Sequence, residues 1–220
     1  MICYASRTGT KRNLAALRLA GWRLLVSRAG VWRTEGFPYA LDNGAWTDAQ
    51  AGQPFDEVAF AKLLTALGAE ADWIVAPDIV AGGLESLALS MAWLPRLQAL
   101  GRPVLIAVQD GMEPEDLAGI VGAEIGVFLG GSTEWKLAKM AAWGRFCAEA
   151  GCHYHVARVN TERRIRMAHA AGAHSIDGSS ASRFAVTVPP LDAARRQPDL
   201  WAPPRAGGAL VPPLVSGERG

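Results

Sequence analysis

Near its middle the chain reads Val104-Leu105-Ile106-Ala107-Val108 and then Gln109-Asp110-Gly111, an apolar run that ends in a polar, glycine-containing turn. The same unit recurs along the whole sequence. The other seven runs cover residues 2–5, 23–26, 39–41, 73–77, 125–129, 154–157 and 175–176. Helix-length amphipathic segments separate most of them. Eight strand–helix units in succession are typical of a single-domain α/β protein with a (β/α)8 (TIM) barrel, whose active site forms at the C-terminal ends of the strands.

Apolar residues at helical spacing predict where the helices lie. The predicted helices cover residues 10–20, 55–67, 84–100, 114–121, 133–150 and 161–171. We expect the barrel to span residues 1–192. Residues 193–220 are rich in proline and glycine and have few periodic apolar positions, so we expect a flexible or surface-strapping tail there.

The bulk composition is that of an ordinary soluble protein. The 220 residues are 50% apolar and 20% charged with a net charge of +1, so no global field draws the chain to nucleic acid or to a membrane. The 3 cysteines form no CxxC pair, which argues against a disulfide framework or a structural zinc site. The start lacks a signal-peptide layout, and no apolar run approaches the roughly 20 residues of a membrane span. We expect a cytoplasmic protein, in a bacterium or in the host of a phage that encodes it.

Two aspartates follow apolar runs that are far apart in the sequence. Asp42 ends the run at 39–41, and Asp177 ends the run at 175–176. In a barrel both carboxylates would face one cavity. Carboxylates on either side of a sugar's anomeric carbon are the usual equipment for glycosyl transfer, because one attacks and the other moves protons. Two alternatives stay open: Asp42 only caps an Asx turn, or the pair binds a divalent metal.

Other strand ends carry groups that suit a purine base. We assign substrate contacts to Asn43, Trp46, Asp78, Gln109, Gly130 and Gly131. A carboxylate beside an amide matches a purine's Watson–Crick edge, since the acid accepts from N–H groups and the amide donates to a carbonyl oxygen. A glycine pair lets a flat ligand approach the backbone. The plainer alternatives are that Gln109 braces its own loop, that the glycines form a tight turn, and that Trp46 is buried by packing.

The predicted rim also carries donors for a phosphate backbone. We assign nucleic-acid contacts to Arg7, Arg158, Ser179, Ser180 and Arg183. Barrels often bind phosphate in the loops after strands seven and eight, where the two serines lie. The alternatives are solvated arginines and a serine-rich cap for a short helix at 181–184.

The histidines do not predict a metal centre. We expect His153 and His155 to point to opposite faces of the seventh strand and His174 to lie at the bottom of the barrel. We therefore predict no metal and no cofactor. A metal-dependent barrel hydrolase with Asp42, Asp78 and Asp177 as ligands remains an alternative.

Five motifs, in this order, resemble the tRNA-guanine transglycosylase superfamily. They are Leu41-Asp42-Asn43-Gly44-Ala45-Trp46, Pro77-Asp78, Val108-Gln109-Asp110-Gly111, Leu129-Gly130-Gly131 and Ser175-Ile176-Asp177-Gly178. The resemblance covers most of residues 1–190. It implies a (β/α)8 barrel that exchanges guanine in a nucleic acid for a 7-deazaguanine, with Asp177 as the nucleophile on the sugar C1′ and Asp42 as the general acid/base. It further implies that Asp78, Gln109 and the Gly130-Gly131 backbone recognise the base.

The sequence departs from the tRNA enzymes in two respects. Those enzymes are longer and carry a cysteine-rich zinc site near the C-terminus, which nothing after Cys152 can supply. In its compact length the chain is similar to the short, DpdA-like DNA-guanine transglycosylases of phages and DNA-modification gene clusters. Asn43-Gly44-Ala45-Trp46 also stands where the tRNA enzymes usually have Ser-Gly-Gly-Phe, so the accepted deazaguanine can differ.

The resemblance implies two kinds of partner. One is a nucleic acid, with DNA favoured over tRNA, and the other is a free 7-deazaguanine such as preQ0. No membrane contact is expected, whereas a homodimer or a partner protein of a modification system is compatible with the sequence. The alternative from another class is a non-catalytic nucleic-acid-binding partner of a catalytic transglycosylase, against which the intact Asp42 and Asp177 argue.

Overall fold

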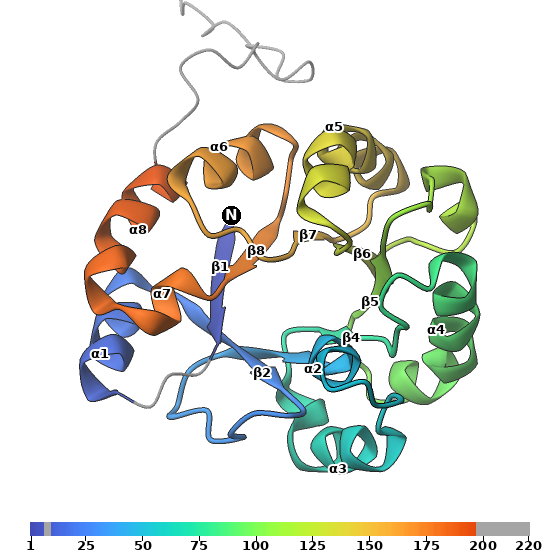
Figure 1. Ribbon diagram of the computed structural model, residues 1–220, viewed down its shortest axis with the longest axis horizontal. Coiled ribbons are helices and arrows are strands. Elements are labelled where there is room, and N and C mark those ends of the chain that lie inside the picture. Colours follow the sequence, from blue (N-terminus) through green and yellow to red (C-terminus); the bar gives the residue numbers. More distant parts are fainter. Residues whose placement is uncertain (7–9, 197–220) are drawn as a thin grey trace, which may run out of the picture.

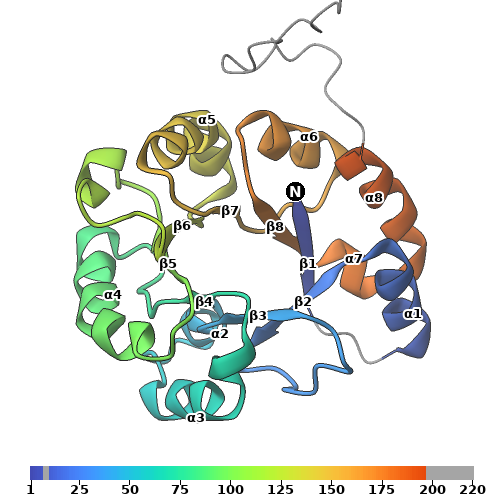
Figure 2. The ribbon, with the colours of Figure 1, turned by 180° about the vertical axis from the view of Figure 1, so that it is seen from behind.

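Strands of the chain close into a barrel. A computed structural model describes residues 1–6 and 10–196. The strands are β1 (Ile2–Ser6), β2 (Arg23–Ser27), β3 (Tyr39–Asp42), β4 (Ile74–Val75), β5 (Val104–Val108), β6 (Ile125–Leu129), β7 (Tyr154–Val156) and β8 (Ser175–Gly178). Within the described residues all eight are parallel and pair in chain order, and β8 returns to pair with β1. The predicted (β/α)8 barrel is confirmed (Figure 1, and from behind Figure 2).

Helices surround the barrel. They are α1 (Lys11–Ala20), α2 (Ala45–Gln50), α3 (Glu57–Leu67), α4 (Gly83–Gln98), α5 (Thr133–Ala150), α6 (Glu162–Ala170), α7 (Ser180–Arg183) and α8 (Val188–Arg196), with 3-10 turns at Gly68–Glu70, Pro114–Leu117 and Ala185–Thr187. The helix predicted at 133–150 coincides with α5, whereas the segment predicted at 114–121 forms only a short 3-10 turn. No helix in the described part of the chain has both the length and the apolar character needed to cross a membrane.

Alternation along the strands separates the apolar side chains into two layers. The inner layer fills the barrel and consists of Tyr4, Leu25, Ala40, Trp73, Val75, Leu105 and Ala107, with Ile2 and Phe128 packed against them. The larger outer layer lies between the strands and the helices. On β5 the inner positions are Leu105 and Ala107, so Gln109 continues the same face at the C-terminal end of the strand. The same alternation leads from Ala40 to Asp42 on β3, and it brings polar side chains to the mouth of the barrel.

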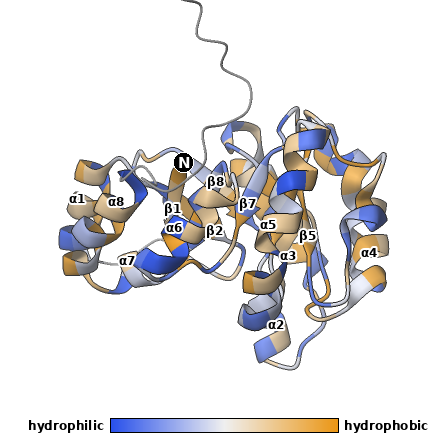
Figure 3. Cartoon of the chain, turned by 90° about the horizontal axis from the view of Figure 1, so that it is seen from above, coloured by the Kyte–Doolittle hydropathy of each residue, from blue (hydrophilic) through white to orange (hydrophobic). Residues whose placement is uncertain are grey.

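The sequence periodicity does not predict α2, which has only six residues. It begins after Gly44, whose φ of 82° is in the left-handed region that glycine adopts without strain. A buried arginine, Arg28, anchors the helix. Its Nε donates to the Asn43 carbonyl at 3.1 Å, and its guanidinium pairs with Asp48 within α2. The side view shows α2 standing out at one end of the molecule (Figure 3).

The barrel continues past the boundary expected at residue 192, because α8 runs to Arg196. Asp192 is buried and accepts a hydrogen bond from Trp22 Nε1 at 3.2 Å. Arg195 donates to the same carboxylate and to the carbonyls of Met1 and Ala20, at 3.4 and 3.1 Å. The C-terminal helix is therefore tied to the start of β1 and to the end of α1. Of the tail predicted at 193–220, residues 197–220 lie outside the described residues.

Arg195 and Arg196 both pair with Asp192, so they provide a matched test of how α8 is attached to the barrel. We expect Arg195→Met to lower the free energy of unfolding by about 2 kcal/mol, because it leaves a buried carboxylate without its main partner. Arg196→Met should cost less than about 1 kcal/mol, since the Arg196 side chain is 63% exposed and that of Arg195 only 19%. Urea denaturation of both variants measures the difference. Equal losses of unfolding free energy would contradict the role of Arg195 in attaching α8.

Candidate active site

The C-terminal ends of the strands surround a cavity of about 650 Å³. We call it the mouth cavity. Its lining includes most of the residues predicted for the site, namely Asp42, Asn43, Trp46, Asp78, Gln109, Gly130, Gly131, Arg158, Asp177 and Ser179. Ser180 and Arg183 are not in the lining, and Arg7 lies outside the described residues. Strand ends from all parts of the sequence therefore meet in one space large enough for a nucleoside.

Asp42 ends β3 and turns its carboxylate toward this cavity. Its Oδ1 accepts the backbone N–H of Gly44 at 3.3 Å, so the Asx-type contact considered from the sequence is present. The residue nevertheless also lines the cavity. Burial raises the pKa of Asp42 to about 6, and the charge of Asp177 raises it further against the opposing effect of the Gly44 N–H. A carboxyl group with this pKa can hold or release a proton near neutral pH.

Asp177 lies on β8 and is only 9% exposed. Its Oδ1 accepts two hydrogen bonds, from His155 Nε2 at 3.0 Å and from the backbone N–H of Arg158 at 3.2 Å. Within the described residues Oδ2 accepts none. One oxygen of the carboxylate is therefore anchored, and the other is left to face the mouth cavity.

His155 and His153 point into the barrel together, so the expectation that they lie on opposite faces of the strand is wrong. Residues two positions apart on a strand share a face. His155 Nδ1 and His153 Nε2 each lie 2.8 Å from Ser175 Oγ. Burial lowers the pKa of both imidazoles, that of His153 to about 3. The contact of His155 with Asp177 is the main site feature that the sequence analysis missed. The correct strand period would have placed His155 on the inner face of the barrel.

Asp78 is held between two amide side chains. Asn43 Nδ2 donates to its Oδ1 at 2.7 Å, and Gln109 Nε2 donates to its Oδ2 at 2.8 Å. Gln109 Nε2 also donates to the Ile79 carbonyl at 2.8 Å, and its Oε1 accepts the Ala81 N–H at 2.5 Å. Gln109 thus braces the loop after β4, as the plainer alternative had it. Burial raises the pKa of Asp78 to about 6, although the Asn43 hydrogen bond opposes this.

Arg158 connects three parts of the rim. Its φ is +54°, which is unusual for a residue other than glycine, and its backbone N–H donates to Asp177. Its guanidinium donates to the Gly131 carbonyl and lies 4.7 Å from the centre of the Trp46 ring. β3 and β7, which lead to Trp46 and Arg158, are four strands apart in the closed barrel. The Trp46–Arg158 contact therefore spans the mouth cavity.

The Gly130-Gly131 turn is a close approach of backbone to side chains. Gly131 has φ of 69°, and a Cβ there would lie 2.7 Å from Asp110 Oδ2 and 2.7 Å from the Trp135 ring. Asp110 in turn accepts the N–H and the hydroxyl of Ser132, both at 2.6 Å. Packing therefore requires glycine at position 131. The Gly131 carbonyl already accepts a hydrogen bond from Arg158.

A buried lysine, Lys136, lies beside the site. It is 1% exposed, sits in α5, and donates to the carbonyl of Ala157. Burial lowers its pKa to about 8, and the Arg158 charge lowers it further while Asp177 opposes the shift. Position 136 looks like part of a polar helix face in the sequence, which is why the sequence analysis did not select it.

The serines after β8 have different roles. Ser180 donates its N–H to Asn160 Oδ1 at 3.0 Å and its hydroxyl to the Asn160 carbonyl at 3.3 Å, so it fastens α7 to the preceding loop. Ser179 is exposed and lines the cavity. Arg183 is exposed on α7, outside the lining.

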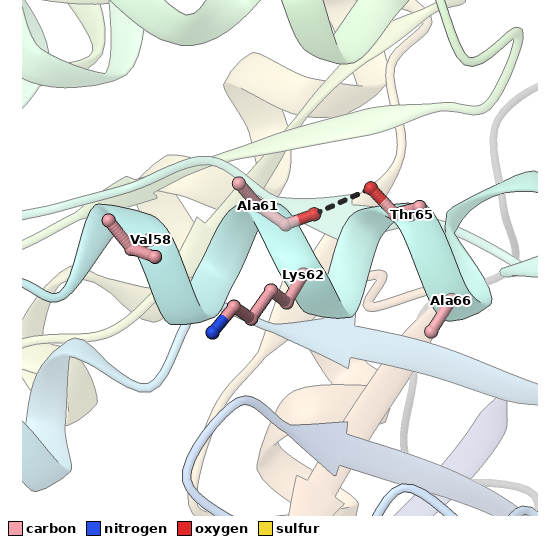
Figure 4. A pocket seen from close by; sticks show the side chains of 5 residues that line it. All are labelled: Val58, Ala61, Lys62, Thr65 and Ala66. Atoms are coloured by element: carbon pink, nitrogen blue, oxygen red, sulfur yellow. Dashed lines mark hydrogen bonds between the residues drawn. The ribbon is translucent and has the colours of Figure 1, made fainter.

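A second depression, on α3, has none of these features (Figure 4). Its lining is Val58, Ala61, Lys62, Thr65 and Ala66, all from one helix. Thr65 donates to the Ala61 carbonyl at 3.0 Å within that helix, so Lys62 is the only charged group in the lining. This surface offers no convergent set of polar groups.

No metal-binding cluster occurs in residues 1–6 and 10–196: three or more His, Cys, Asp or Glu side chains do not come together there in a suitable arrangement. Asp42, Asp78 and Asp177 are thus not placed as a ligand set. In comparisons with known proteins, no protein-family model matches the chain, and no curated protein matches it.

The raised pKa of Asp42 predicts a measurable effect on stability. The carboxyl ionises near 3.8 in the unfolded chain and near 6 in the folded one, so above about pH 6 the fold contains an unfavourable buried charge. We expect Asp42→Asn to raise the free energy of unfolding by about 1–2 kcal/mol at neutral pH. The gain should vanish as the pH falls to about 4, where the carboxyl is protonated in the folded state and increasingly so in the unfolded chain.

Chemical denaturation at the two pH values tests this. Asp116→Asn is the control, because Asp116 caps the turn at Glu113 outside the cavity and should give no pH-dependent gain. An Asp42→Asn variant that is less stable than the wild type at neutral pH would contradict the assignment.

Proposed function

We propose that the protein is a base-exchange transglycosylase that replaces guanine in a nucleic acid, DNA in preference to tRNA, by a free 7-deazaguanine such as preQ0. The observation that carries the proposal is the pair of carboxylates in one cavity. Asp42 can carry a proton near neutral pH, and Asp177 presents one anchored and one free oxygen. A carboxyl group that can carry a proton, beside a second carboxylate with one oxygen free to attack, is the pattern expected of an acid and a nucleophile.

The proposed reaction has two displacements. The free Oδ2 of Asp177 attacks the sugar C1′, the bond from C1′ to guanine breaks, and the departing guanine takes its electron pair and a proton from Asp42. This gives a covalent glycosyl ester on Asp177. The incoming deazaguanine then loses a proton to Asp42 and displaces the carboxylate from C1′. Two inversions give net retention, and Asp42 is protonated again as at the start.

Recognition of the base rests mainly on Asp78 and the backbone around Gly130. The Gln109 amide is already engaged by four protein partners, namely Asp78, Ile79, Ala81 and Ser86, so its proposed contact with the base would require these bonds to change. Asp78 keeps acceptor lone pairs beyond the two amide bonds and lines the cavity. Its N–H partners on a guanine would be the ring and exocyclic nitrogens of the Watson–Crick edge.

The nucleic acid would reach the cavity as a flipped nucleotide, at a cost of a few kcal/mol for leaving the stack. Trp46 is 48% exposed and is the aromatic side chain at the entrance. Arg158 beside it and Ser179 at the rim can hold phosphates. The preference for DNA rests on the resemblance to short, DNA-directed transglycosylases.

Exchange of labelled guanine tests the reaction directly. We expect the purified protein to transfer radiolabelled guanine into plasmid DNA and not into tRNA offered in parallel. Asp177→Asn should abolish both this exchange and any covalent protein–nucleic acid adduct, while Asp116→Asn should retain both.

Three outcomes would count against the proposal. Full exchange by Asp177→Asn excludes the nucleophile, and label in tRNA alone reverses the choice of substrate. Nucleic-acid binding without exchange by the wild-type protein would favour the non-catalytic binding partner.

Trp46 gives a separate prediction about binding. Stacking of a base on an aromatic ring contributes about 1–3 kcal/mol, so Trp46→Ala should weaken the binding of single-stranded DNA by about 5- to 100-fold. Phe184→Ala is the matched control, because Phe184 is 62% exposed but does not line the cavity. Fluorescence anisotropy measures both variants, and equal affinities would exclude a stacking role for Trp46.

A further inference from the structure

We propose that His155 is a positioning residue, which orients the Asp177 side chain through a chain of hydrogen bonds that runs from His155 to Ser175 and His153. We call these four residues the buried chain. The inference deepens the proposed function and rests on it, because it assigns to His155 the task of directing the nucleophilic oxygen. Nothing in the five motifs of the sequence includes His155.

The buried chain is continuous along the inside of the barrel. Asp177 Oδ1 lies 3.0 Å from His155 Nε2, and His155 Nδ1 lies 2.8 Å from Ser175 Oγ. Ser175 Oγ lies 2.8 Å from His153 Nε2. His155 and Ser175 are 0% exposed, so water does not compete for these contacts.

When Asp177 is ionised, the donor and the acceptor of each hydrogen bond in the buried chain can be assigned. A carboxylate only accepts, so His155 Nε2 carries the proton. Burial lowers the pKa of His155, against the opposing effect of its hydrogen bond to Asp177. In a neutral ring with the proton on Nε2, Nδ1 is an acceptor. The single hydroxyl proton of Ser175 must then point to His155 Nδ1, and Ser175 Oγ accepts from His153 Nε2–H.

The His155 ring is fixed in its plane by aromatic neighbours. Phe128 stacks on it with ring centres 4.8 Å apart and an interplanar angle of 13°. Trp73 contacts it at 4.7 Å and Tyr4 at 6.1 Å. Because the ring cannot rotate without displacing this packing, its Nε2–H stays directed at Asp177.

The consequence for the reaction concerns the two oxygens of Asp177. The His155 N–H and the Arg158 backbone N–H hold Oδ1, so Oδ2 is the oxygen that forms the bond to C1′. In the ester, Oδ1 is the carbonyl oxygen and still accepts from His155. When the second base attacks C1′, the electron pair of the C1′–Oδ2 bond returns to the carboxylate, and the His155 N–H stabilises the charge that develops on Oδ1.

Kinetics of three variants test this role. A hydrogen bond to a charged group is worth enough that His155→Met should lower kcat for guanine exchange by about 10- to 100-fold, with KM for the nucleic acid changed less than about twofold. His155→Gln keeps an N–H at a similar position and should recover most of the rate. Tyr4→Phe is the control, because Tyr4 packs on His155 but its hydroxyl donates to Asp72, outside the chain.

The outcomes separate the inference from the proposed function. If the wild type exchanges guanine and His155→Met does so at an unchanged kcat, the inference is wrong and the proposed function stands. If the wild type exchanges no guanine, the proposed function fails, and with it the role of His155. A loss of rate in Tyr4→Phe equal to that in His155→Met would show a general packing effect and would also overturn the inference.

A measurement on the wild type does not depend on whether the variants fold. In long-range ¹H–¹⁵N spectra of protein labelled at histidine, we expect His155 to be the neutral Nε2–H tautomer at neutral pH. An Nδ1–H tautomer or a charged imidazolium would overturn the order of the chain.

Discussion

Withdrawal of carboxylates from water is the constraint that governs the mouth of this barrel. An ionised carboxylate in a poorly hydrated cavity needs hydrogen-bond donors, or it takes up a proton. Burial and the Asp177 charge raise the pKa of Asp42, and its single backbone N–H donor, from Gly44, opposes the rise without cancelling it. Asp177 receives two donors on a single oxygen. One cavity thus holds two carboxyl groups with different hydrogen-bond surroundings, which a transglycosylase of the proposed kind requires.

The third carboxylate of the cavity meets the same constraint in another way. Asp78 takes one amide N–H on each oxygen, from Asn43 after β3 and from Gln109 after β5. These bonds join the ends of three neighbouring strands, since Asp78 itself follows β4. They make Gln109 a structural amide, so in the proposed function the polar recognition of a base falls to Asp78 and to backbone groups.

The fold was predictable because its signal is local and repeated. Eight apolar runs and the turns after them reveal the barrel, and strand period two places Asp42 and Asp177 at its mouth. The remaining features depend on contacts between distant parts of the chain. Asp192 meets Trp22 across 170 positions, and Arg28 reaches α2 from a loop without any periodic pattern. Lys136 has the sequence surroundings of a solvated helix residue, and the packing of α5 against the barrel buries it.

Arg158 connects the entrance of the cavity to Asp177, the proposed nucleophile. Its positive φ costs of the order of 1 kcal/mol or more, and this conformation directs its backbone N–H at Asp177 while its guanidinium extends to Gly131 and Trp46. The two ends of the residue therefore act on different groups. In the proposed reaction an entering nucleotide separates Trp46 from the guanidinium and offers each a new partner, a base for the ring and a phosphate for the cation. The backbone bond to Asp177 is not part of that exchange, so the nucleophile stays in place while the mouth opens.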